Sequence, residues 1–212
     1  MRFSHTCKRG QGGNALLELA VVSIVIIPLF FGMVGVGINM GQMNQALEIG
    51  RDTGHMYARG IDFSQSANQS IIVQLARGTG MTATGGNAVA ILSQISYIYQ
   101  ADCTAAGLST GQCTNLNQYV FTNRIVVGNT SLRASNYGTP SASIVNSSGN
   151  ISSTNYLKNS TAVANVSADL TAAGLTLNDG DIVWLTEFYL STPDISYLGS
   201  PGSLGVYTKA YF

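Results

Sequence analysis

The sequence predicts an α+β protein: an N-terminal transmembrane helix that continues into an extracytoplasmic head with an antiparallel sheet. Two observations predict this class. Twenty consecutive residues, 19–38, carry no charge, and several later segments alternate apolar with polar residues in the manner of strands. The expected divisions are a leader at 1–13, the apolar helix at 14–40 and one α+β domain at 41–212, a length that suits a single core.

The leader is short and basic and ends in the glycine pair Gly12 and Gly13. Its charges are Arg2, Lys8 and Arg9, with no acid among them. Because positive residues accumulate on the cytoplasmic side of membrane helices, we expect the N-terminus in the cytoplasm and the head outside it. Without the leader the chain has more acidic than basic side chains, so binding to nucleic acid through its phosphates is not expected.

The apolar run is long enough to span a membrane, because twenty helical residues at about 1.5 Å each cover roughly 30 Å. An ordinary secretory signal has a shorter apolar core, of about 7–15 residues. Pro28 and the glycines near the outer end of the run are tolerated in membrane helices, where small residues also permit close contact between helices. The segment is therefore either a simple anchor or a helix that packs against other helices.

Glu18 is the one misfit, since a carboxylate carried to mid-bilayer costs about 2.5–3.5 kcal/mol. The order of basic leader, Gly13, four residues, Glu18 and apolar run resembles the signal of prepilin peptidases. Cleavage after Gly13 would make Asn14 the first residue and Glu18 the fifth. Together with Pro28 and the Arg-containing helical sequence at 51–59, the pattern resembles TadE/TadF-like minor pseudopilins of the Tad (tight adherence) pilus system.

The resemblance covers about residues 9–60 and implies a pilin-like structural or assembly component of a Tad-type pilus. It implies a single-pass protein of the bacterial inner membrane, with the pilus as a second location, whose partners are a prepilin peptidase, other pilin-like subunits and the assembly platform. It also implies that Glu18 meets the mature terminal amine of a neighbouring subunit. Two alternatives stay open: Glu18 is an ordinary helix-end residue whose carboxylate reaches the interface, and the chain is an uncleaved membrane-anchored adhesion or binding protein.

The first part of the head is predicted to be helical. The apolar helix should continue from Asn39 to about Arg59, with Met43 and Leu47 on one face, and a second amphipathic helix should run from about Ser64 to Arg77 and pack on the sheet. The glycine-rich segment at 78–87 is similar to a phosphate-binding loop only in composition, because no Lys-Ser/Thr pair follows, and it predicts a turn.

Two strands are expected next, at 88–100 and 119–127. The cysteine-containing loop lies between them. Cys103 and Cys113 remain as an even pair once Cys7 is lost with the leader, and outside the cytoplasm they favour a disulfide worth about 2–3 kcal/mol. In the second strand one face should combine Tyr119, Phe121, Ile125 and Val127.

The rest of the head divides into loops and two further strands. Residues 128–168 are rich in Ser, Asn, Thr and Gly and predict a surface loop; 165–175 predict either a short strand or a helix. A turn at Asp179-Gly180 should lead into a buried strand at 181–190, and residues 205–212 should pair with that strand antiparallel. Residues 191–203, with two prolines, predict an exposed loop.

Catalysis is not expected, and neither a cofactor nor a metal site is indicated. The mature chain has one histidine, His55, so a histidine-based triad is excluded, and two cysteines without further Cys or His ligands make a poor zinc site. A paired-carboxylate site remains open, but the candidate acids flank a turn and strand ends, where acids are ordinary: Asp179, Asp181, Glu187 and Asp194.

Overall fold

The protein was analysed as a computed structural model that describes residues 12–109, 111–191 and 205–212. The chain forms two compact units: residues 1–42 with 195–201, and residues 43–194 with 202–212. The predicted leader lies almost entirely outside the described residues, as do Asp194 and all but the first residue of the predicted loop at 191–203.

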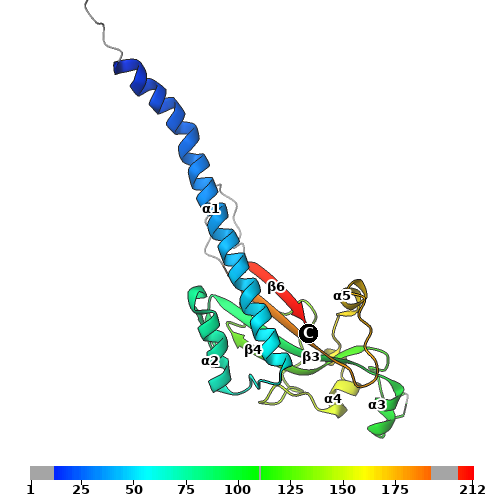
Figure 1. The fold of residues 1–212 in the computed structure, drawn as a ribbon. Coiled ribbons are helices and arrows are strands. Elements are labelled where there is room, and N and C mark those ends of the chain that lie inside the picture. Colours follow the sequence, from blue (N-terminus) through cyan, green and yellow to red (C-terminus); the bar gives the residue numbers. More distant parts are fainter. Residues whose placement is uncertain (1–11, 110, 192–204) are drawn as a thin grey trace, which may run out of the picture. The chain divides into compact units, whose positions relative to one another are not determined.

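Helix α1 spans Gly12–Ala58, and its first part, up to Gln42, belongs to the first unit (Figure 1). The long apolar N-terminal helix is thus confirmed. By length and composition it is the one helix in the described part of the chain that is long and apolar enough to cross a membrane. Pro28 lies inside it and removes one backbone donor, which a helix tolerates at a local cost.

From Met43 onward α1 belongs to the head and packs on the sheet, despite Gly50 and Gly54, which are unfavourable in a helix. Both glycines allow close approach. A Cβ at Gly50 would lie 2.9 Å from the Thr208 hydroxyl oxygen, and one at Gly54 would lie 2.1 Å from the ring of Phe212. The packing explains why helix propensity is overruled here.

The segment after α1 forms a second helix and a small hairpin. Helix α2, Ser66–Leu75, is shorter than predicted and buries Ile72 in the same core as the second part of α1. The glycine-rich segment forms a 3₁₀ turn, η1, and two two-residue strands: Arg77–Thr79, β1 Met81–Thr82 and β2 Gly85–Gly86.

The main sheet has four antiparallel strands in the order β4-β3-β5-β6, which confirms the predicted α+β class. The chain reversals at Asn117 (φ 60°) and Gly180 (φ 82°) use left-handed backbone. The predicted pairing of the last two strands is also confirmed. The strand bounds are β3 Ala88–Tyr97, β4 Tyr119–Gly128, β5 Ile182–Leu190 and β6 Val206–Tyr211.

The prediction that one face of β4 combines its four apolar residues is wrong. Gln94 pairs with Asn123 but Ile95 pairs with Phe121, so Thr122 is an extra residue in β4. A bulge of this kind shifts the alternation by one position. Phe121 therefore packs on one side of the sheet, whereas Ile125 packs on the other with α1.

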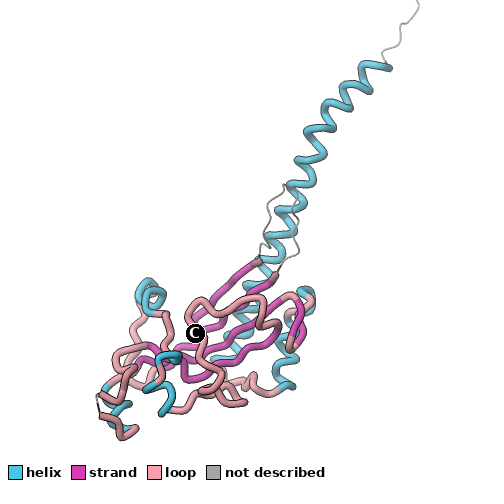
Figure 2. The backbone as a smooth tube through the Cα atoms, turned by 180° about the vertical axis from the view of Figure 1, so that it is seen from behind, coloured by secondary structure: helices cyan, strands magenta, loops and turns pink. Residues whose placement is uncertain are grey.

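The tract at 128–168 is not simply a surface loop, as its polar composition suggested. With the residues after it, it covers the sheet face opposite α1 (Figure 2). Tyr137, Ile144 and Ile151 are buried there against Leu185 of β5. Three short helical segments belong to this cover: α4 Ser153–Lys158, η2 Ser160–Ala162 and α5 Ser167–Ala172, the last of which settles the open choice at 165–175 in favour of a helix.

Candidate functional site

The first part of α1 exposes a continuous apolar surface. Its large apolar side chains from Leu16 to Met40 are between 43% and 72% exposed, and none of the span's most apolar window is buried. Fully burying one such side chain stabilises by about 1.5–3 kcal/mol relative to leaving it in water. An exposed apolar surface of this extent favours contact with lipid or with other apolar surfaces.

The predicted processing residues lie at the start of this helix. Gly13 is the second residue of α1, Asn14 follows it, and Glu18 lies four residues further on. Residues four apart in a helix share one face at a distance of about one turn, roughly 6 Å. Glu18 is exposed and is the single charged residue of α1 before Glu48. The start of α1 thus places Asn14 and one carboxylate on the same face.

The predicted cysteine pair lies at bonding distance. The Sγ atoms of Cys103 and Cys113 are 2.00 Å apart, and both residues are buried. Cys103 belongs to α3, Gln100–Ala105, at whose start the Tyr99 amide donates to the Asp102 carboxylate. The disulfide closes a loop within the β3–β4 connection, and its two cysteines pack with Ile98 and Leu157 beside α4.

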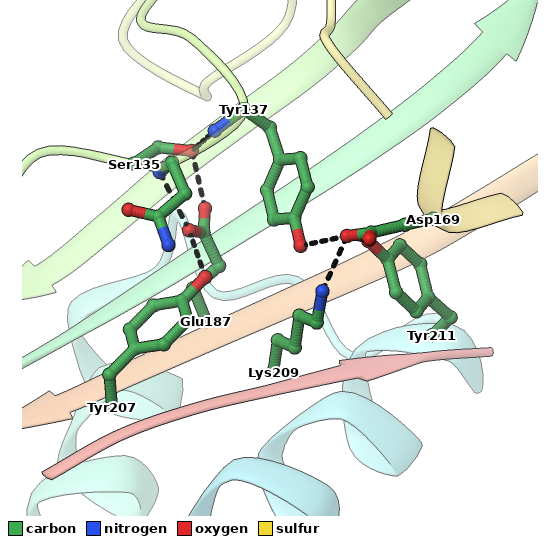
Figure 3. Close-up of polar contacts among 8 residues, drawn as sticks. Ser135, Tyr137, Asp169, Glu187, Tyr207, Lys209 and Tyr211 are labelled. Atoms are coloured by element: carbon green, nitrogen blue, oxygen red, sulfur yellow. Dashed lines mark hydrogen bonds and ion pairs between the residues drawn. The ribbon is translucent and has the colours of Figure 1, made fainter. Parts of the chain in front are cut away.

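A polar cluster that was not predicted from the sequence lies on the covered face of the sheet (Figure 3). Glu187 lies in the middle of β5 and is 1% exposed, so its placement at a strand end was wrong. Its carboxylate accepts hydrogen bonds from the Ser135 hydroxyl, the Asn136 amide at 3.0 Å and the Tyr207 hydroxyl at 2.7 Å. Burial, and then the bond to Glu187, raise the pKa of Tyr207, which keeps its phenol a donor at neutral pH.

A second carboxylate, Asp169 of α5, links the loops and short helices that cover the sheet to β6, the strand at the edge of the sheet (Figure 3). Its Oδ2 accepts from Lys209 Nζ at 2.5 Å, from the Tyr137 hydroxyl and from the Tyr211 hydroxyl at 2.9 Å. These bonds, that of Lys209 foremost, lower the pKa of Asp169 to about 2. Lys209 stands opposite Glu187 in the strand pairing, yet it binds Asp169.

Two arginines complete the polar layer. Arg124 of β4 is buried and donates to Ser93 Oγ at 2.8 Å and to the Gly138 carbonyl at 3.0 Å. Burial lowers its pKa to about 10, which leaves it protonated at neutral pH. The guanidinium of Arg133 lies over the Tyr207 ring, 4.3 Å from its centroid. These contacts hold the loop cover on the sheet.

A catalytic arrangement is not evident among the described residues. His55 lies against the Phe212 ring, 4.5 Å between centroids, with no carboxylate or nucleophile bonded to it. No group of three or more His, Cys, Asp or Glu side chains in the described ranges is placed to hold a metal ion. The polar cluster instead has its acceptors filled by donors of the same chain.

The cluster left one signal in the sequence. Tyr207, Lys209 and Tyr211 alternate along the last strand, as residues of one face do. The other members of the cluster are distant in sequence, with Ser135 and Tyr137 in a loop and Asp169 in α5, so no local pattern could join them to the strand.

Comparisons with protein-family models, with curated proteins and with solved structures find no match. The function is therefore argued from the residues and the geometry.

Proposed function

We propose that this protein is a pilin-like structural or assembly component of a Tad-type pilus, of the TadE/TadF-like class. In this proposal a prepilin peptidase cleaves the chain after Gly13. The first part of α1 then lies in the bacterial inner membrane, the N-terminus faces the cytoplasm, and the head lies outside it. One observation carries the proposal: an exposed apolar helix that has a single carboxylate, Glu18, four residues after the expected new terminus.

The exposed apolar surface supports both a membrane anchor and packing against other pilin-like helices. Lipid tails and neighbouring apolar helices cover such a surface equally well by composition. Glu18 distinguishes the two environments, because an unpaired carboxylate in apolar surroundings is expensive and a neighbouring ammonium group removes part of that cost. The mature amine at Asn14 of a second subunit would supply this partner and would fix the axial register of the two helices.

Mass spectrometry of the protein from its own membrane fraction tests the processing step. We expect a mature chain that begins at Asn14. A bulky residue directly before the scissile bond, Gly13→Phe, should leave the precursor intact, whereas the matched control Gly10→Phe in the leader should still be processed. An intact leader on the wild-type chain, in cells where the peptidase is active, would contradict the proposal and would support an uncleaved anchored adhesion or binding protein.

The pairing role of Glu18 needs a separate test. Glu18→Gln keeps the shape of the side chain and removes its charge, so we expect normal membrane insertion and loss of co-purification with other pilin-like subunits. Glu48→Gln changes the next acid along the same helix and should affect neither. If the Glu18→Gln chain assembles as well as the wild type, the carboxylate does not pair with the terminal amine.

A further inference from the structure

The outer edge of β6 has the features of a binding site for a peptide strand. Among the described strands β6 pairs with β5 alone, and the Trp184 and Phe212 backbones exchange two hydrogen bonds of 3.0 Å. In an antiparallel ladder only alternate residues bond to a given neighbour. The amide and carbonyl groups of Tyr207, Lys209 and Tyr211 therefore point away from β5, and they bond to no other backbone group in the described part of the chain.

Proteins usually protect such an edge with a proline, a bulge, or a lysine that extends over it. β6 contains no proline and its register with β5 is uninterrupted. Lys209 does not extend over the edge, because its ammonium group is held back on Asp169. The unpaired edge is thus accessible to another strand.

A groove of about 580 Å³ lies beside this edge. α1 covers one face of β6, where the Thr208 hydroxyl donates to the Ala46 carbonyl, and α5 meets the opposite face through Asp169. The groove is lined by residues 208–211 of β6, by Phe212 after it, and by residues from both sides. Leu47 of α1 and Leu175, after α5, are 38% and 44% exposed and offer apolar contacts to a bound segment.

The charged side chains that line the groove indicate which kind of peptide segment could bind there. Its lining includes Arg51, His55 and Lys209 but no acid among the described residues. Lys209 is paired with Asp169, whereas Arg51 and His55 have no ion-pair partner in the described part of the chain. The acids Glu48 and Asp52 line an adjacent hollow along α1, which shares Leu47, Arg51 and His55 with the groove.

We propose that the edge of β6 binds an extended segment of another protein that carries an acidic side chain. The segment adds a strand to the sheet: its backbone bonds to the outward groups of Tyr207, Lys209 and Tyr211, and its carboxylate meets Arg51. Binding of this kind derives affinity from main-chain hydrogen bonds and specificity from side-chain contacts. The proposal does not depend on processing at Gly13 or on the role of Glu18.

The test is selection of a displayed library of random nonapeptides on the full chain in detergent micelles. We expect enriched peptides that alternate apolar with polar residues and contain an Asp or Glu. In fluorescence-polarisation titrations of the synthetic peptides, Arg51→Glu should weaken binding by about tenfold or more. Arg77→Glu, an exposed arginine outside the groove, is the matched control and should leave binding unchanged.

A backbone readout separates strand addition from simple charge attraction. N-methylation of the peptide amides that face β6 should abolish binding, whereas methylation of the alternate set should not, because only one set bonds to the edge. No enrichment, peptides that bind the Arg51→Glu chain as tightly as wild type, or equal effects of the two methylation patterns would each overturn the proposal. Thermal melts of the Arg51→Glu chain verify that it is folded.

Discussion

Removal of the Glu187 carboxylate should destabilise the head far more than removal of an exposed acid. Three partly buried donors, from Ser135, Asn136 and Tyr207, converge on this buried carboxylate. Glu187→Ala leaves all three without an acceptor, each at about 1–3 kcal/mol before relaxation. Loss of one partner from a buried charged network costs about 3–5 kcal/mol. We therefore expect a loss of about 3–5 kcal/mol for the alanine variant.

Glu187→Gln should cost less, because the amide can occupy the same place. Its carbonyl oxygen can keep the bonds from Asn136 and Tyr207, and its NH₂ group can donate to Ser135 Oγ, which also accepts from the Tyr137 amide at 3.1 Å. The charge is lost, and a hydrogen bond to a charged group exceeds a neutral one by about 1 kcal/mol. We expect a loss of about 1–3 kcal/mol.

Thermal unfolding of the full chain in detergent micelles measures these differences. Trp184 is the one tryptophan in the chain and lies in β5 three residues from Glu187, so its fluorescence reports on this strand. For a chain of this size 1 kcal/mol shifts Tm by about 2–4 °C. Glu187→Ala should thus lower Tm by about 6–20 °C. The control Glu48→Gln, at an exposed site, should stay within about 2 °C. An alanine variant as stable as this control would refute the assigned role of the carboxylate.

Three further outcomes are expected from the same unfolding assay. Gly128→Ala should cost about 1–3 kcal/mol, because the φ of Gly128 is 102° and a Cβ would lie 2.3 Å from the Ala88 carbonyl oxygen. Gly174→Ala should cost less, because a Cβ at Gly174, whose φ is 68°, would meet nothing within 4 Å. Reduction of the pair formed by Cys103 and Cys113 should lower stability by about 2–3 kcal/mol, and a melt that reductant leaves unchanged would show that the pair is not bonded. Because the pKa of Asp169 is lowered, its carboxylate stabilises the head at pH values above about 3.9, the ordinary pKa of the group, and this stabilisation is lost as the pH falls through about 2. Asp169→Asn should remove the contribution at a cost of roughly 1 kcal/mol or less, since the side chain is about one-third exposed.

The elements that depend on local pattern were predictable from the sequence. The long apolar helix, the turn at Gly180 and the pairing of β5 with β6 follow from composition, turn chemistry and alternation within one segment. The bulge at Thr122 was not predictable, because it depends on which β3 residue each β4 residue faces. The continuation of α1 was predicted from the spacing of Met43 and Leu47 and is confirmed to Ala58, and the close packing at Gly54 explains why this glycine does not end the helix.

The candidate sites also differ in whether they depend on local sequence or on long-range contacts. Gly13, Asn14 and Glu18 are close in sequence, so their spacing along a helix could be stated without the structure. The cluster around Glu187 and Asp169 joins residues from 135 to 211 and exists only because the loop cover folds over β5 and β6. The unpaired edge of β6 has no sequence signature at all, since only the strand order shows which strand lacks a second neighbour.

The two parts of α1 require different surroundings, and this difference organises the protein. After Met43 the helix buries Ala46, Ile49 and Tyr57 in its own head, so the chain itself satisfies that surface. Before Gln42 the described chain provides no comparable cover, and the exposed side chains there are nearly all apolar. The second part of α1 thus contributes to the core of the head, whereas the apolar surface of the first part suits lipid or other apolar helices. Within the first part of α1, only the Glu18 carboxylate distinguishes lipid from neighbouring helices, because it gains an ammonium partner only against a second subunit. Its substitution therefore tests which of the two surroundings the helix has.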